Sequence, residues 1–222
     1  MVFEMPIGPN QNEAAKVKRH GLVGPQDLWQ AKRQFQIDFL LRMGLKRDDH
    51  LLDFGCGTLR GGIPLIEYLH AGRYLGVDVR SEVLAEGRLE LEESGLLDKE
   101  PELVHCDRLD RLQLGRTFSV AWAFQVLIHV PDDSLDDTIA AVTRHLGPGG
   151  VFYATVNLGD QADGSWKGFP VVYRSASFYR ETFRRQGLEV VDLGSLPDFG
   201  HVHPRTSPEA QSRQRMLRAR HA

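Results

Sequence analysis

Cysteine is scarce in this chain, long apolar runs are absent, and neither sign of charge dominates. Of 222 residues only Cys56 and Cys106 are cysteines, which is too few for a disulfide framework. No stretch approaches the roughly 18 consecutive apolar residues that a membrane span needs. The opening residues, MVFEMPIGPNQNEAAK, lack the basic start and apolar run of a secretory signal. We therefore expect a reducing, cytoplasmic compartment and no membrane partner.

The charge balance gives no reason to expect a nucleic-acid partner. The formal net charge is −3 at pH 7, and the pI is near 6.3. Hydrophobic residues make up 41% of the chain and charged residues 26%, which is typical of a globular protein. At this length a single core is sufficient, and we expect one domain over residues 1–222.

The order of apolar patterns predicts an α/β fold. Residues 1–24 form a polar arm with a short helix near 13–19, and a second helix is expected over 25–43. We expect residues 1–44 to form a cap, and residues 45–222 the α/β core. From residue 50 onward, predicted strands (50–54, 73–79, 102–106, 118–124, 151–156) alternate with predicted helices (61–69, 81–93, 134–146). This alternation predicts a doubly wound parallel sheet, because parallel strands need crossover connections.

The C-terminal part of the chain departs from this alternation. A helix at 176–186 precedes two strand-like runs, 188–193 and 213–220, which have only a loop between them. These two runs are expected to form an antiparallel pair at one edge of the sheet. The prediction is a mainly parallel, seven-stranded sheet with an antiparallel C-terminal edge pair and an N-terminal helical extension.

The stretch LLDFGCGTLRGG at residues 51–62 ends a buried strand in an acid and a glycine turn. Ligands of open α/β sheets bind at such carboxyl ends of strands. A nicotinamide fingerprint would need a glycine where Arg60 stands, unless Gly61 substitutes for it with a one-residue shift. A P-loop would need a Lys-Ser/Thr pair after the glycines, and there is none. Asp53 would repel a pyrophosphate but suits a cationic amine. Gly55 and Gly57, with Cys56 between them, let the backbone pass close to a ligand.

Two further acids follow the next strands. Asp78, with Val79 after it, ends the second strand, where a carboxylate can accept hydrogen bonds from both ribose hydroxyls. Asp107 follows the third strand, within reach of an adenine amine. A ligand with an amine, a ribose and an adenine but no phosphates is S-adenosylmethionine.

Taken in order, LLDFGCG, GVDV, HCD, AFQVLIHVPDD and LGPGG resemble the successive motifs of the class I S-adenosylmethionine-dependent methyltransferases, over about residues 45–195. The resemblance implies that Asp53 holds the methionine end of the cofactor, Asp78 the ribose and Asp107 the adenine. It also implies that Phe124 and Gln125, at the end of the fourth strand, face the methyl-transfer centre. Leu59 departs from the pattern, because it stands where a third glycine is common.

Several residues are candidates for the acceptor side. His129 is either a general base or a packed structural residue. In an extended segment the rings of His201 and His203 would point to the same side, so they are either metal ligands or a pair of bases, or else ordinary loop residues. No acid cluster completes a metal site with them, and His201 is a substrate-binding candidate. Arg60 either meets the cofactor carboxylate or pairs with a surface acid.

The long segment 157–173 is expected to cover the acceptor, with Trp166 and Tyr173 as substrate-binding candidates. Trp29, Arg33 and Gln34 are candidates for closing the opposite side.

The expected function is methyl transfer to a small molecule, at oxygen or nitrogen. Methylation of a protein or RNA, and cofactor binding without catalysis, are the alternatives. The sequence lacks the N/D-P-P-Y/F motif of amino-group methylation of nucleic-acid bases. A homodimer in which residues 1–24 pack on a second copy is left open.

Overall fold

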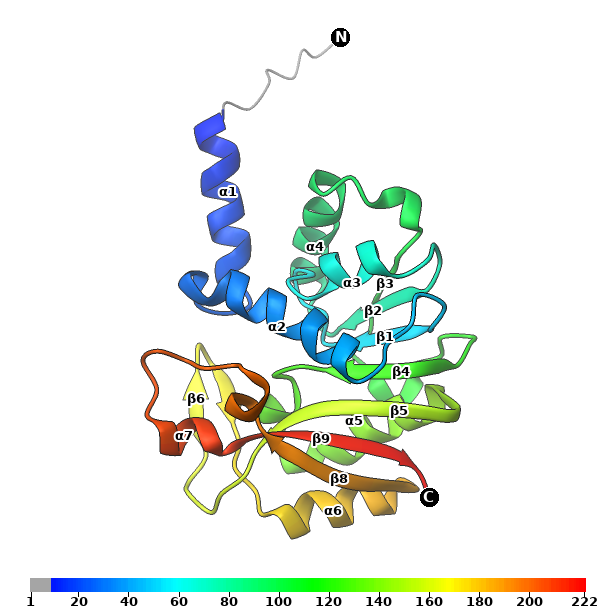
Figure 1. The fold of residues 1–222 in the computed structure, drawn as a ribbon, viewed down its shortest axis with the longest axis vertical. Helices are drawn as coiled ribbons and strands as arrows, with labels where there is room; N and C mark the ends of the chain where they lie inside the picture. Colours follow the sequence, from blue (N-terminus) through cyan, green and yellow to red (C-terminus); the bar gives the residue numbers. More distant parts are fainter. Residues whose placement is uncertain (1–8) are drawn as a thin grey trace.

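A seven-stranded sheet forms the centre of the molecule in the computed structural model, which describes residues 9–222 (Figure 1). The strand order is β3-β2-β1-β4-β5-β9-β8. The first five strands in the chain are β1 (Leu51–Phe54), β2 (Tyr74–Asp78), β3 (Glu102–His105), β4 (Phe118–Ala123) and β5 (Leu146–Asn157), and they pair in parallel. β8 (Leu188–Ser195) and β9 (Gln214–His221) are antiparallel to each other, and β9 is antiparallel to β5. The predicted sheet and its antiparallel edge pair are confirmed.

Helices cover both faces of this sheet. α2 (Trp29–Arg42), α3 (Gly62–Tyr68) and α4 (Ser81–Glu93) contribute to the core on one face, and α5 (Asp132–His145) and α6 (Ala176–Arg185) to the core on the other. Side chains alternate along β1, so Leu52 joins the α5–α6 side while Leu51 joins the α2–α3 side. Because α2 supplies buried Phe35 and Phe39, this helix is part of the core as well as of the N-terminal extension.

Several element boundaries differ from the predictions. The second helix is divided into a short 3-10 turn, Gln26–Leu28, and α2. α5 begins at Asp132 rather than at residue 134, because Pro131 is its N-cap and two acidic residues occupy its favourable first turn. β5 begins at Leu146, so the LGPGG turn lies inside the strand, beside a register shift against β4.

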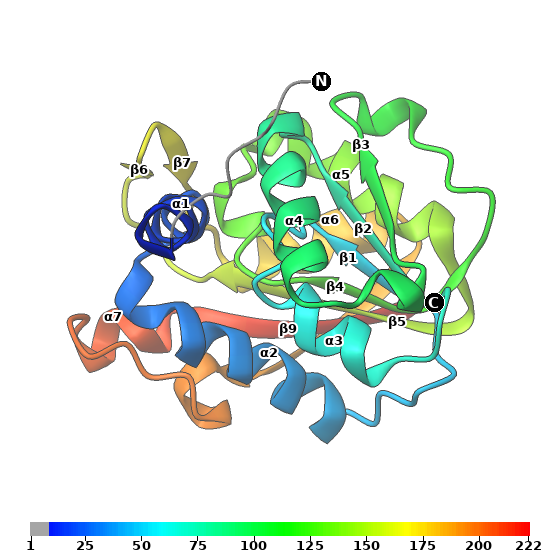
Figure 2. The same ribbon diagram turned by 90° about the horizontal axis from the view of Figure 1, so that it is seen from above.

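The long segment after β5 contains a small hairpin that was not predicted. β6 (Gly164–Trp166) pairs antiparallel with β7 (Phe169–Val171) through a two-residue turn. Both turn residues, Lys167 and Gly168, have positive φ, as the tight turns of twisted hairpins require. The Lys167 ammonium donates to the carbonyl of Gly21, and Figure 2 shows the hairpin beside α1 (Pro9–Gly21).

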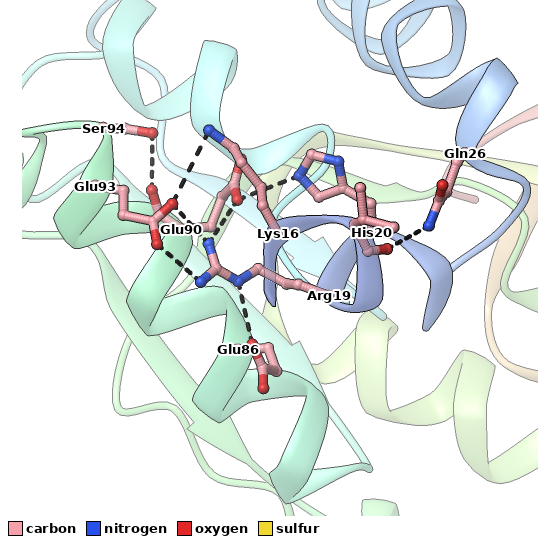
Figure 3. A network of polar contacts seen from close by, with 9 residues as sticks. Lys16, Arg19, His20, Gln26, Glu86, Glu90, Glu93 and Ser94 are labelled. Carbon is pink, nitrogen blue, oxygen red and sulfur yellow. Dashed lines mark hydrogen bonds and ion pairs between the residues drawn. The ribbon is translucent and has the colours of Figure 1, made fainter. Parts of the chain in front are cut away.

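Ion pairs of the buried Arg19 side chain attach α1 to α4 (Figure 3). The Arg19 side chain is 2% exposed, and its guanidinium donates to Glu86, Glu90 and Glu93 at 2.9–3.1 Å. Hydrogen bonding to Glu93 is the largest cause that raises the pKa of Arg19. These contacts fix the path of the chain into the next segment, Leu22–Pro25. Residues 1–8 of the predicted arm lie outside the described part of the chain.

The remaining elements are short. α7 (Pro208–Ser212) precedes β9, and 3-10 turns occur at Leu97–Lys99, Leu109–Arg111, Leu127–His129 and Leu196–Phe199. Among residues 9–222, no helix is long and apolar enough to cross a membrane.

Candidate cofactor and acceptor site

A cavity of about 480 Å³ opens at the carboxyl ends of β1, β2 and β4. The chain runs outward from β1 to β3 and then returns to β4 beside β1, so the winding of the sheet reverses at this place. Three regions close the cavity: the segment Leu22–Pro25 with α2, the β6–β7 hairpin, and the loop between β8 and β9. Of the residues predicted for cofactor binding, catalysis or substrate binding, all but Asp107 line it: Asp53, Gly55, Cys56, Gly57, Asp78, Val79, Phe124, Gln125, His129, Trp166, Tyr173 and His201.

The glycine turn has a backbone that other residues would strain. Gly55 has φ +76° and Gly57 has φ +59°. A Cβ on Gly55 would lie 2.4 Å from a methyl carbon of Val126, and one on Gly57 would lie 2.8 Å from Val23. Leu59 also has φ +59°, so the position of the usual third glycine keeps the left-handed backbone although its side chain is fully buried.

Asp53 is a buried carboxyl at the cavity floor. Its side chain is 4% exposed and accepts a hydrogen bond of 2.6 Å from the Tyr74 hydroxyl. Burial raises the pKa of Asp53 to about 7, and the Tyr74 hydrogen bond opposes this shift. The carboxyl is thus poised to ionise when a cationic ligand enters the cavity.

Asp78 joins the end of β2 to the glycine turn. Its carboxylate accepts from the backbone N–H of Gly57 at 2.9 Å and from that of Arg80 at 3.0 Å. The Arg80 guanidinium lies 3.6 Å away. Since each carboxylate oxygen can accept two hydrogen bonds, both retain capacity for a ligand hydroxyl.

Asp107 lies apart from these groups. It is exposed and does not line the cavity, although Leu109, two residues further along, does. The structure therefore brings together the first two predicted acids but not the third. The carboxyl of Asp107 stays a predicted adenine partner that would have to turn toward the cavity.

His129 lies at the acceptor side, beside Trp166 and Phe169 of the hairpin. Its Nδ1 is 2.7 Å from the carbonyl oxygen of Pro170, which can only accept, so Nδ1 carries the proton. Burial lowers the pKa of His129. The neutral ring therefore has an unprotonated Nε2, which a general base requires, while its Nδ1 attaches the hairpin.

His201 and His203 both line the cavity. The His201 ring lies 4.9 Å from Phe35 and 5.7 Å from Phe124, between centroids. Burial, with the positive charges of Lys32 and Arg60, lowers the pKa of His201 to about 4. Within residues 9–222, no group of three or more His, Cys, Asp or Glu side chains is placed to hold a metal ion.

Lys32 is a charged cavity residue that the sequence analysis missed. Its side chain is 7% exposed, and its ammonium donates to the side-chain oxygen of Gln125. Burial, with the nearby Arg60 charge, lowers the pKa of Lys32 to about 7. A signal was available in the sequence, because Lys32 and Gln36 interrupt the apolar face that contains Trp29 and Phe39.

Arg60 is also buried, with 7% exposure, and donates to the Val23 carbonyl at 2.8 Å. Its predicted alternative role, pairing with a surface acid, is not what the structure shows. The Trp29, Arg33 and Gln34 side chains, expected to close the cavity, do not line it, and Gln34 instead bonds to exposed Asp38.

Comparison with known proteins identifies the domain. Residues 52–152 match the sequence model of a methyltransferase domain. These residues are similar to a methyltransferase domain, and the whole chain has the fold of the class I S-adenosylmethionine-dependent methyltransferases. An S-adenosylmethionine-dependent methyltransferase from Clostridium acetobutylicum has a TM-score of 0.66 at 15% identity, covering 95% of this chain and 98% of that one. The glycopeptide N-methyltransferase MtfA, complexed with S-adenosyl-L-homocysteine, also gives 0.66, at 14% identity over 98% of this chain and 100% of that one.

A curated relative is the ubiquinone biosynthesis O-methyltransferase of Acinetobacter baumannii. It is 31% identical over 109 residues, which are 48% of this chain and 44% of that protein. The chain thus spans less than half the length of this curated relative. The structural likenesses, at 14–15% identity, establish the fold.

Proposed function

We propose that the protein transfers the methyl group of S-adenosylmethionine to a small molecule, at oxygen or nitrogen. One observation carries the proposal: a single cavity joins Asp53, the glycine turn and Asp78 to a wall of aromatic rings. The first three features suit a cofactor with an amine and a ribose. The wall, which includes Phe124 and Trp166, suits an organic acceptor.

The residues present fit this cofactor. Asp53 would hold the ammonium of its methionine end, and Asp78 would accept from the ribose hydroxyls. Arg60, buried above the turn with its Nε unpartnered, would hold the carboxylate. When bound, the cofactor would supply a methyl group on a positively charged sulfur, and that sulfur would leave with the bonding electrons as the acceptor atom bonds in line to the methyl carbon.

The chain itself contributes positioning and a proton acceptor. Holding two reactants in line removes much of the entropic barrier of a displacement. His129 would take the proton of an acceptor hydroxyl or amine at Nε2, because its Nδ1 proton is fixed on Pro170. The β6–β7 hairpin and Tyr173 would cover the acceptor and limit the access of water. Cytoplasmic location and a homodimer through residues 1–24 stay predictions.

Calorimetric titration with S-adenosylmethionine, S-adenosylhomocysteine and NAD in parallel tests the proposal. Binding of the first two alone is expected, and binding of NAD alone would replace the proposal with that of an oxidoreductase. An acceptor screen by release of S-adenosylhomocysteine then separates small molecules from protein or RNA. Binding without turnover on any of these acceptors would favour a non-catalytic protein.

Substitution of Asp78 tests the ribose assignment directly. Asp78→Ala should weaken S-adenosylhomocysteine binding by about a hundredfold or more, since two hydrogen bonds to a charged group contribute about 3 kcal/mol. Asp78→Asn keeps an oxygen for the Gly57 N–H and separates loss of the ribose contact from disorder of the turn. Asp107→Ala tests the adenine assignment, and exposed Asp98→Ala is the control. Wild-type affinity in both Asp78 variants would refute the ribose assignment.

A further inference from the structure

Two cationic side chains lie in the cavity wall made by α2 and the glycine turn, and neither forms an ion pair within residues 9–222. Lys32 and Arg60 both lie in it, each with 7% exposure. Within residues 9–222, no carboxylate lies within ion-pair distance of either one; their hydrogen-bond partners are the Gln125 amide and the Val23 carbonyl. Asp53 is near enough to favour the charge of Arg60. Lys32 has no such support, because the charged group that acts on it is Arg60.

The two cationic ends reach the same corner of the cavity. A Cβ placed on Gly24 would lie 2.9 Å from Nη1 of Arg60 and 4.0 Å from Nζ of Lys32. From this corner Lys32 extends to Gln125, which follows β4 at the predicted methyl-transfer end. Its ammonium has three donors and gives one of them to the Gln125 amide. The other donors are free for a ligand.

The remaining titratable groups of the cavity do not balance Lys32. His129 and His201, from two other elements, are bases, and the Lys32 charge lowers the pKa of both. Neither acid pairs with Lys32: Asp53 accepts a hydrogen bond from Tyr74, and Asp78 accepts from the backbone of the glycine turn and of Arg80. The proposed cofactor brings two cationic centres and one carboxylate, so it adds net positive charge. A buried cation without a partner is costly, and an anionic acceptor would supply the partner.

We propose that Lys32 binds a carboxylate of the methyl acceptor, so that the protein selects acidic acceptors. This inference rests on the proposed function, in which Arg60 is assigned to the carboxylate of the cofactor. Lys32 then binds the acceptor on the side of this corner that faces Gln125, whereas Arg60 lies on the side of Val23. The acceptor class is a small organic acid with an apolar or aromatic body that packs on Phe124 and Trp166.

The test uses protein saturated with S-adenosylhomocysteine and three acids, acetate, benzoate and 3-phenylpropionate, each paired with its neutral amide. Calorimetry or ligand-observed NMR gives each affinity for wild type, Lys32→Met, Lys32→Arg and the exposed control Lys46→Met. At least one acid should bind wild type at least about tenfold tighter than its amide, the value of one charge-assisted hydrogen bond. Lys32→Met should abolish this preference, while Lys32→Arg and Lys46→Met should keep it. The preference should also fall as the pH rises above about 7, where free Lys32 loses its proton.

Three results would overturn the inference. The first is equal binding of every acid and its amide, and the second is a preference that persists in Lys32→Met. The third is loss of S-adenosylhomocysteine affinity in Lys32→Met as large as in Asp78→Ala, which would assign Lys32 to the cofactor. Near wild-type cofactor affinity in Lys32→Met also shows that this variant is folded. Failure of the wild type to bind S-adenosylhomocysteine would instead overturn the proposed function, and the inference with it.

Discussion

Replacing Asp53 by Asn should stabilise the unliganded protein at high pH and weaken its cofactor binding. The side chain is 4% exposed, and burial raises its pKa from 3.8 to about 7. The folded state thus holds this proton more tightly than the unfolded state does. Stability from this group is fully present below about pH 4 and is lost as the pH rises toward 7. Asn has nearly the same shape, its oxygen can accept from Tyr74, and it has no charge to bury.

The magnitude follows from the two pKa values. Ionisation of Asp53 is easier in the unfolded state, so it lowers the free energy of unfolding as the pH rises. At about pH 5 this loss corresponds to roughly one pKa unit, and at about pH 8 to about three pKa units. Two units correspond to about 3 kcal/mol. The unfolding free energy of wild type should therefore fall by about 3 kcal/mol relative to Asp53→Asn over this range. The comparison removes any pH-independent cost of the Asn amide group.

Urea unfolding of both proteins at a series of pH values measures this difference. A difference that stays flat from about pH 5 to about pH 8 would show that Asp53 has no raised pKa. Calorimetry gives the second half of the prediction: S-adenosylhomocysteine should bind Asp53→Asn about tenfold to a hundredfold more weakly, since a charge-assisted hydrogen bond contributes about 1.5–3 kcal/mol. For wild type the affinity should fall below about pH 7, where the carboxyl becomes protonated. Unchanged affinity would refute the role of Asp53 as the ammonium partner.

Two further predictions concern the turn and the N-terminal segment. Gly55→Ala should destabilise the protein more than Gly72→Ala, and only Gly55→Ala should weaken S-adenosylhomocysteine binding. Both glycines have φ near +70°, but a new Cβ contacts a neighbouring side chain, that of Val126, only at Gly55. Equal losses of stability in denaturant unfolding would contradict this prediction. Arg19→Met should cost about 3 kcal/mol of stability, because it leaves the buried Glu90 carboxylate with only its 3.4 Å contact to His20. It should also weaken cofactor binding through Leu22–Pro25, whereas exposed Arg184→Met should cost at most about 0.5 kcal/mol. A Tm equal to that of Arg184→Met would show that the ion pairs do not hold α1.

Prediction of the cofactor side from the sequence was possible because its residues are local to strand ends. Asp53 and Asp78 each end a predicted parallel strand, and neighbouring parallel strands end at the same edge of the sheet. That geometry brings the two acids together without knowledge of any other contact. The position of the Asp107 side chain could not be predicted in this way. Its strand was predicted correctly, but the direction of one side chain in an exposed loop depends on local contacts.

The sequence by itself determined the winding of the sheet, the glycine turn and the first two acids, since periodicity and turn chemistry act over short stretches of chain. Only the tertiary structure decided the acceptor side. Lys32 is 93 residues from Gln125, and His129 is 41 residues from Pro170. Burial against residues so distant sets the charge of Lys32 and the tautomer of His129, and no local pattern encodes either. The same reason hides the β6–β7 hairpin, whose two three-residue strands are fixed by contacts with His129 and α1.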